Sequence, residues 1–160
     1  MDRAALRICE ARLHINDCET TFTAVQAKLR RLKAQEPNLG LVIVDYIQLL
    51  KIGGGRKTET RQQEVTEITG GLKMLAKELQ IPIVALAQLN RGPEMRNDKK
   101  PLVSDLRESG AIENDADIIV LIYREDAYEK ESPRAGEVDL IVAKHRNGPT
   151  ATITVAAQLH

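Results

Sequence analysis

The sequence predicts an α/β fold in which a mostly parallel sheet is flanked by helices and ends in an antiparallel hairpin. Two observations carry this prediction. Short apolar runs typical of buried strands alternate with longer stretches whose apolar residues recur every three or four positions, as on one face of a helix. Near the C-terminus, Asn147-Gly148 separates two further apolar runs, and Asn-Gly between strands is a strong hairpin signal.

The first half of the chain is expected to contain two short strands and two helices, and the strand over 41–44 is apolar on both faces, as a buried parallel strand is. Residues 12–16 alternate in polarity as a strand does. Either Thr21 or Thr23 can cap the helix that follows, and Thr23 with Gln26 fits a capping box. The clearest helix is predicted over about residues 60–80, and its apolar face would consist of Val65, Ile68, Leu72, Leu75 and Leu79.

Gly70 and Gly71 lie inside this helix, where each costs about 1 kcal/mol relative to alanine. Only close packing or a bend would explain them. After a strand over 83–88 and a polar loop, residues 104–107 are expected to form a short turn or helix. Three more strands are predicted over 117–123, 137–143 and 150–155, of which the first is expected to be buried.

Length and composition indicate one domain that needs no metal or disulfide. A chain of 160 residues can bury a sizeable core, and its two cysteines, Cys9 and Cys18, match no zinc spacing. They suggest no disulfide framework either, so we expect a cytoplasmic location. No run of about 18 apolar residues is present, which predicts no membrane span. Basic and acidic residues balance at 23 each, which argues against a surface that grips nucleic acid everywhere.

Polar side chains follow two of the predicted strands at the point where each strand ends. Asp45 follows the apolar run 41–44, and Gln88 ends the strand over 83–88. The carboxyl ends of strands line the ligand crevice of an open parallel α/β sheet. A carboxylate and an amide there indicate a site for a nucleotide and Mg²⁺, with Gln88 orienting a water or sensing a γ-phosphate. Taken alone, Asp45 could equally be a helix cap or a turn former.

Residues 53–58 resemble a phosphate-binding loop only at first glance. That loop needs Gly-x-x-x-x-Gly-Lys-[Ser/Thr], whose backbone N–H groups cradle phosphates. Counting back from Lys57 and Thr58, the two glycine positions hold Arg56 and Lys51. A flexible basic loop is therefore the better interpretation, and no phosphate-binding loop is found in the 160 residues.

Two basic segments are candidates for contact with phosphates. Arg107 can hold a phosphate and Gly110 lets a backbone amide approach one, although a surface turn with an ion pair between Arg107 and Glu108 explains the same residues. Lys144 and Arg146 lie two apart on an extended hairpin and so share a face. They suit a cation pair that enters a neighbouring subunit's nucleotide site, as an arginine finger does, and equally an exposed basic turn.

Six segments, in the same order, resemble the C-terminal motor domain of the DnaB-family replicative helicases. The resemblance covers nearly the whole chain, from about Leu13 onward. The matching segments are residues 41–49, 61–65, 87–92, 104–110, 113–117 and 143–150. The resemblance implies a RecA-like fold that works as a homo-oligomeric, hexameric ring around single-stranded DNA, with primase and a helicase loader as partners in the primosome and no membrane contact.

The same resemblance implies a role for each candidate residue. Asp45 is the Walker B aspartate, which holds Mg²⁺, and Gln88 senses the γ-phosphate of ATP. Lys144 and Arg146 correspond to the pair that reaches the nucleotide of the neighbouring subunit. The residues that correspond to the loop along the DNA backbone are Arg107, Glu108 and Gly110.

In this family the Gly-Lys-Thr phosphate loop and the catalytic glutamate lie upstream of the aspartate strand, and neither is found before Asp45. We therefore interpret residues 1–160 as a partial RecA-like motor domain without that segment and without the N-terminal partner-binding domain. The expected function is that of the C-terminal part of an ATP-dependent 5′→3′ replicative DNA helicase, with no ATP hydrolysis by the chain alone. The alternative is a non-catalytic remnant that binds DNA or a helicase. Another RecA-like ATPase, such as a recombinase, fits the basic segments less well.

Overall fold

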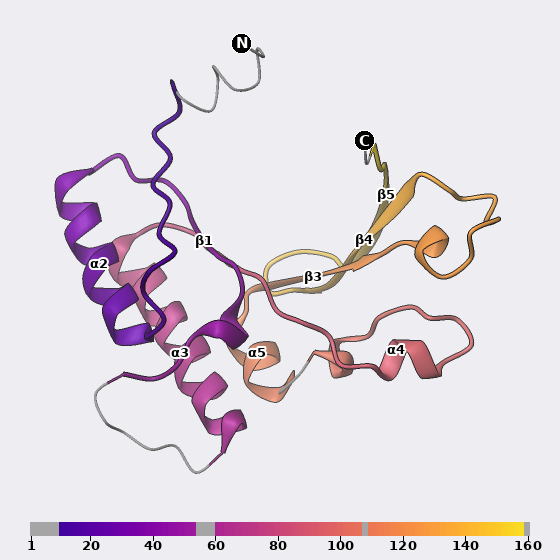
Figure 1. Ribbon diagram of the computed structural model, residues 1–160, viewed down its shortest axis with the longest axis horizontal. Helices are drawn as coiled ribbons and strands as arrows, with labels where there is room; N and C mark the ends of the chain where they lie inside the picture. Colours follow the sequence, from indigo (N-terminus) through magenta and orange to yellow (C-terminus); the bar gives the residue numbers. More distant parts are fainter. Residues whose placement is uncertain (1–9, 54–59, 107–108, 159–160) are drawn as a thin grey trace.

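The computed structural model describes residues 10–53, 60–106 and 109–158. Helices α2 (Phe22–Gln35) and α3 (Arg61–Leu79) lie side by side at one end of the molecule. Strands β3 (Ile118–Tyr123), β4 (Glu137–His145) and β5 (Ala151–Ala156) form the other end, and β1 (Val42–Val44) lies between (Figure 1). Within the described ranges, no helix combines the length and the apolar character that crossing a bilayer requires.

A βαβ unit forms the first half of the fold. β1 pairs in parallel with β2 (Ile83–Ala85), and α3 connects the two strands after a short 3₁₀ turn, η1 (Ile47–Leu49). α3 buries all five apolar residues of its predicted face. Some of them join a cluster with β1 and others join a larger cluster with Phe22, Ile47 and residues of β3. The periodicity of the sequence therefore predicted the main core correctly.

The ends of α3 also agree with the sequence, and of the two predicted caps for α2 the structure confirms Thr21. Thr60 is the N-cap of α3 and forms a capping box with Gln63. The predicted box between Thr23 and Gln26 is wrong, because α2 begins one residue after Thr21, whose hydroxyl accepts from the Ala24 N–H at 3.4 Å. The strand predicted over residues 12–16 is also wrong, since that segment is exposed and unpaired with any strand.

One of the two helical glycines has a packing reason. A Cβ at Gly71 would lie 2.2 Å from the Phe22 ring, so α2 can approach α3 only because this position has no side chain. A Cβ at Gly70 would meet its nearest neighbour, Asp115, at an ordinary 3.7 Å. Close packing therefore explains Gly71 and not Gly70.

The predicted mostly parallel sheet is wrong for the described residues. Two separate sheets are present: the parallel pair β1–β2, and an antiparallel sheet in the order β3-β4-β5. β3 was expected to be a buried strand of the mostly parallel sheet, but its burial alternates. The connection from β3 to β4 contains no crossover helix to return the chain in the same direction, so the strands pair antiparallel. The predicted C-terminal hairpin is confirmed by β4 and β5.

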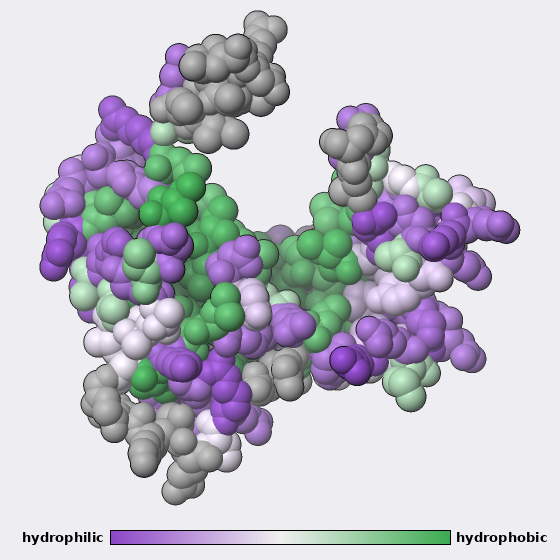
Figure 2. Space-filling view, viewed as in Figure 1, coloured by the Kyte–Doolittle hydropathy of each residue, from purple (hydrophilic) through white to green (hydrophobic). Residues whose placement is uncertain are grey.

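One face of the antiparallel sheet is apolar and uncovered. Ile122, Leu140 and Ile153 lie opposite one another on three neighbouring strands, and Ile122 and Ile153 are 65% and 52% exposed. In the parallel pair, Ile43 and Val84 share a face and are exposed in the same way. Figure 2 shows hydrophobic surface on the floor of the notch between the two ends of the molecule.

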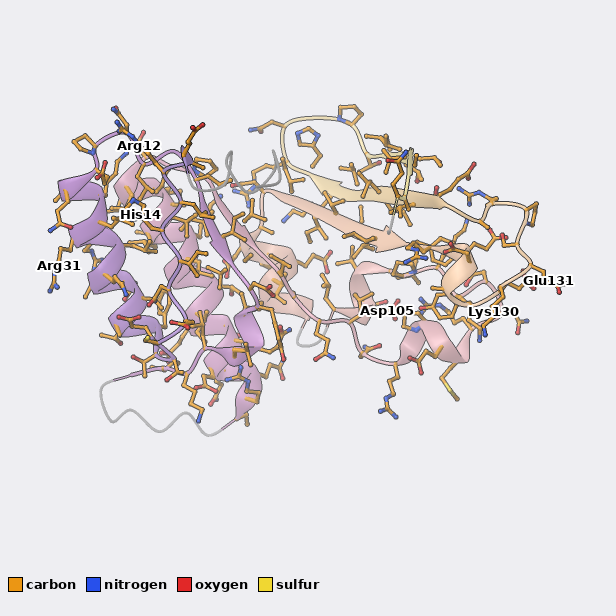
Figure 3. All side chains as sticks on the ribbon, turned by 45° about the horizontal axis from the view of Figure 1, so that its top comes forward. Arg12, His14, Arg31, Asp105, Lys130 and Glu131 are labelled. Carbon is orange, nitrogen blue, oxygen red and sulfur yellow. The ribbon has the colours of Figure 1, made fainter. Side chains whose placement is uncertain are left out.

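Short elements fill the rest of the chain: α4 (Gly92–Met95), η2 (Val103–Asp105), α5 (Ser109–Asp115) and η3 (Glu125–Ala127). Asp105 lies inside the fold near α4, whereas Lys130 and Glu131 lie at the far tip of the loop between β3 and β4 (Figure 3). Arg96 and the Leu102 N–H both donate to the Asp105 carboxylate. These hydrogen bonds, that from Arg96 above all, lower the pKa of Asp105 and tie the loop before α5 together.

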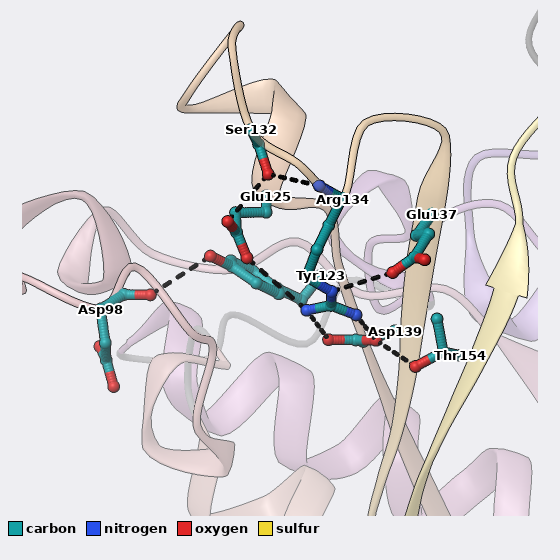
Figure 4. A network of polar contacts seen from close by, with 8 residues as sticks. All are labelled: Asp98, Tyr123, Glu125, Ser132, Arg134, Glu137, Asp139 and Thr154. Atoms are coloured by element: carbon teal, nitrogen blue, oxygen red, sulfur yellow. Dashed lines mark hydrogen bonds and ion pairs between the residues drawn. The ribbon is translucent and has the colours of Figure 1, made fainter.

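A polar network holds the loop between β3 and β4 against the sheet (Figure 4). The Arg134 guanidinium donates to both oxygens of Asp139, at 3.0 and 2.6 Å, and to Glu137 at 2.9 Å. Thr154 on β5 donates to the same Asp139 carboxylate at 2.7 Å. Because Arg134 and Thr154 both favour its charged form, the pKa of Asp139 falls to about 2.

Candidate functional site

β1 and β2 end side by side, so the residues that follow them lie at one rim of the sheet. Asp45 comes directly after β1 and Gln88 follows the end of β2, and both are exposed. Backbone hydrogen bonds continue the pairing past the strand ends. The Leu86 N–H donates to the Val44 carbonyl at 2.9 Å, and the Ile47 N–H donates to the Leu86 carbonyl at 3.0 Å. The two polar residues that the sequence singled out therefore follow the ends of adjacent parallel strands.

A glutamine that sequence reasoning missed connects to this rim. The Gln88 N–H donates to Oε1 of Gln48 at 3.2 Å, and the Gln48 carbonyl accepts from Nη2 of Arg61 at 2.7 Å. Arg61 opens α3, so the rim is joined to the start of that helix. A polar residue between Ile47 and Leu49 was the one signal in the sequence that could have drawn attention to Gln48.

Glu64 completes the connection between the rim and α3. It forms an ion pair with Arg61 and accepts from the Ile52 N–H at 2.9 Å. Partial burial opposes its ionisation, but these two hydrogen bonds outweigh burial, and the pKa of Glu64 lies below its ordinary value. Glu64 is therefore a carboxylate at neutral pH, and it holds Arg61 in the orientation that meets Gln48.

The donor set at the rim is small. Asp45 is the carboxylate there, and its peptide bond to Tyr46 is cis. In the part of the chain that the structure describes, no group of three or more His, Cys, Asp or Glu residues could enclose a metal ion. A single carboxylate nevertheless suits Mg²⁺, which keeps several waters and is often held by one or two carboxylates together with phosphate oxygens.

Lys144 and Arg146 share a face, as their spacing predicts, but this face is turned toward their own chain. Lys144 donates to the carbonyls of Glu113 and Asn114, and Arg146 donates to the Asn114 carbonyl at 3.3 Å. Arg146 also lies 3.4 Å from the Asp117 carboxylate. The two cations therefore sit at the C-terminal end of α5, where unpaired helix carbonyls favour positive charge.

Asp117 fixes Arg146 from the other side. Its carboxylate also forms an ion pair with Lys73 on α3, and the hydrogen bond from Lys73 is the main reason why the pKa of Asp117 is lowered. Lys73, Asp117 and Arg146 thus link α3 to the end of β4. No local pattern in the sequence indicates these ion pairs, because Lys73 lies far from Asp117 and Arg146 along the chain.

The predicted DNA loop is described only at its end. Arg107 and Glu108 lie outside the described residues. Gly110 lies in α5, and a Cβ there would meet nothing within 4 Å, so packing does not require this glycine. Among the described hydrogen bonds and ion pairs, none joins Lys144 or Arg146 to Asp45 or Gln88.

Comparison with known proteins places these features in context. The family model of the DnaB-like helicase C terminal domain matches residues 1–160. The replicative DNA helicase DnaB of Leifsonia xyli is 60% identical over 153 residues, which cover 95% of this chain and 33% of that protein. The corresponding helicase of Geobacillus stearothermophilus is 48% identical over 150 residues, which cover 93% of this chain and 33% of that protein.

Solved structures agree. One is the structure of a DnaB-like replicative helicase, described together with its interactions with primase. It superimposes with a TM-score of 0.88 at 39% identity, and the match covers 96% of this chain and 37% of the helicase chain. The ATPase domain of G40P gives the same TM-score and identity and is covered to 54%. The chain spans about a third of the length of the curated relatives it matches. By these criteria the chain belongs to the family of the DnaB-like helicase C-terminal domain.

Proposed function

We propose that this chain acts as the C-terminal part of an ATP-dependent 5′→3′ replicative DNA helicase, working in the cytoplasm. The observation that carries the proposal is the rim where the parallel strands β1 and β2 end, with Asp45 after the first strand and Gln88 after the second, in a chain 60% identical to a replicative helicase. The carboxyl ends of parallel strands are where α/β folds bind nucleotides. The name of one structural neighbour, an ATPase domain, supports the same reading.

In this proposal the residues at the rim act on ATP and Mg²⁺. Asp45 would hold Mg²⁺, because this ion is commonly bound by one or two carboxylates together with water and phosphate oxygens, and the Asp45 carboxylate is exposed. The Gln88 amide contacts the γ-phosphate and responds to its loss. When bound, the ion neutralises the charge that develops on the transferred phosphoryl group.

The chain supplies part of a RecA-like motor domain, and another part of the helicase covers its apolar face. Ile43 and Val84 on one sheet and Ile122 and Ile153 on the other are exposed, although such side chains favour burial. Among the described residues the two sheets are separate, so strands β2 and β3 each have an edge without a partner strand, to which a further strand could add. The segment with the phosphate-binding loop is our candidate for this place.

The remaining candidate residues serve assembly and DNA. Lys144 and Arg146 exchange their contacts with α5 for the nucleotide of a neighbouring subunit in a hexameric ring. The loop that follows single-stranded DNA consists of Arg107, Glu108 and Gly110. Primase is a proposed partner because a structural neighbour is described in its interactions with primase, and a helicase loader is a second proposed partner.

ATP hydrolysis by the chain and by a chimera tests the proposal. The chimera is the Leifsonia helicase with its matching third replaced by this chain, a replacement that 60% identity supports. We expect no turnover by the 160 residues alone, and DNA-stimulated turnover by the chimera that Asp45→Ala abolishes. Hydrolysis by the isolated chain that depends on Asp45 would contradict the proposed partial domain. An inactive, folded chimera that still binds DNA would favour a non-catalytic module.

A further inference from the structure

We propose that Gln48 is the residue that positions Gln88, and that it does so from a place fixed by α3 through Arg61. The inference rests on the proposed function, because it assigns Gln48 to the same rim. The observation behind it is that the side-chain oxygen of Gln48 accepts a hydrogen bond from the Gln88 N–H. In a continuous ladder a backbone carbonyl would accept it.

The backbone pairing between the segments after β1 and β2 ends just before Gln88, whose N–H therefore has no backbone acceptor across the sheet among the described residues. Up to Leu86 the two segments exchange backbone hydrogen bonds. Beyond that point the first segment turns into η1, where the Ile47 carbonyl accepts from the Leu50 N–H at 3.1 Å and the Gln48 carbonyl accepts from Arg61 at 2.7 Å. The next N–H along the second segment that bonds across is that of Gln88, and it finds Oε1 of Gln48 at 3.2 Å. The Gln48 amide thus extends the ladder by one step and sets the backbone from which the Gln88 side chain projects.

The orientation of the Gln48 amide is defined by this contact. The Gln88 N–H can only donate, so it must face the oxygen of Gln48 and not its NH₂ group. The NH₂ group is then buried without a partner. Buried polar groups are nearly always paired, so an exception needs an explanation other than stability. A methionine of similar shape would fill this place without an unpaired donor, and what it would lack is the acceptor for Gln88.

Arg61 fixes the other end of Gln48. Its guanidinium donates to the Gln48 carbonyl at 2.7 Å and to the Leu50 carbonyl at 3.1 Å, and Glu64 holds it by an ion pair. Gln48 is therefore held at its backbone by α3 and holds Gln88 with its side chain. A displacement of Gln88 on loss of the γ-phosphate would be transmitted along this path to the start of α3.

Amide hydrogen exchange on the ¹⁵N-labelled 160-residue chain tests the contact. Gln48→Met removes the acceptor and keeps the volume, so we expect the Gln88 amide to exchange at least about threefold faster while amides inside α3 keep their rates. Gln62→Met, on the exposed side of α3, is the matched control and should leave the Gln88 amide unchanged. An unchanged Gln88 rate in Gln48→Met would overturn the proposal.

ATP hydrolysis by the chimera tests the positioning role. Gln48→Met should lower kcat about tenfold with KM nearly constant, since a misplaced sensor affects the transition state more than binding. In a Gln88→Ala background the same change should have no further effect, because residues that act through one another are not additive. Additive losses, or a full rate in Gln48→Met, would overturn the inference. If the parent chimera is inactive, the proposed function has failed, and the exchange experiment still decides whether Gln48 holds Gln88.

Discussion

The two ends of this molecule are held together in different ways. Around α3 the contacts are apolar: Val65, Ile68 and Leu75 are completely buried among side chains from α2, β1 and β3. Around β4 the central side chain is charged: Arg134, in the loop before β4, binds Asp139 and Glu137 on that strand. The core of the first end therefore depends on close packing, which is insensitive to pH, and ion pairs of Glu64 and Asp117 lie around it, whereas the second end is centred on the buried Asp139 carboxylate.

The largest expected effect comes from removing volume beside α3. Leu75→Ala should lower the free energy of unfolding by about 3 kcal/mol, since Leu75 is 0% exposed and the change leaves a cavity. Its neighbour Met74 is 65% exposed, so Met74→Ala should change stability by less than about 0.5 kcal/mol. Urea unfolding measures both. Equal effects of the two variants would mean that α3 is not the centre of the core.

Replacing each of the two glycines of α3 with alanine should have opposite effects on stability. Gly71→Ala is expected to destabilise the chain by about 1–3 kcal/mol, because its Cβ would collide with Phe22. Gly70→Ala meets no close neighbour and should stabilise by up to about 1 kcal/mol through helix propensity. Thermal unfolding of the pair is the measurement. A stabilised Gly71→Ala would show that α2 does not lie against α3 as described.

Lowering the pH should affect the contributions of Asp139 and Leu75 to stability differently. The pKa of Asp139 is lowered from 3.8 to about 2, so its ion pair stabilises the fold above pH 4, and this contribution is lost as pH falls from about 4 toward 2. Thr154→Val removes one hydrogen bond to Asp139 and should reduce this acid-dependent loss. Leu75→Ala should lower stability equally at every pH. Urea midpoints between pH 2 and 6 test both, and an unaltered pH profile in Thr154→Val would contradict the role of the network.

The smallest expected effect is at the first turn of α3. Thr60→Ala removes the hydroxyl that accepts from the Gln63 N–H at 3.2 Å, and it should cost about 0.5–1 kcal/mol. Thr60→Ser keeps the cap and serves as the control in the same urea assay. Loss of stability in both variants would indicate that the threonine methyl group, and not the cap, matters.

The features that the sequence could predict are those with a local signal. The helix over 60–80 and the C-terminal hairpin were predicted correctly, because their signals, apolar period and Asn-Gly, lie within short stretches. The antiparallel pairing and the half-exposed face of β3 were not predicted, because an apolar run shows neither the direction of the neighbouring strand nor which face stays uncovered. At the rim, strand ends located Asp45 and Gln88, whereas Gln48 and Arg61 meet Gln88 only after folding. Contacts between residues distant in sequence leave no local pattern to detect.

The row formed by Ile122, Leu140 and Ile153 has a practical consequence for anyone who prepares this chain by itself. Apolar side chains on a flat sheet attract any similar surface in water, and the nearest one in a concentrated sample is another copy. Light scattering should therefore rise with protein concentration, and a dye such as ANS should fluoresce on the folded chain. Replacing Ile122 with threonine would keep the strand and make the sample easier to handle.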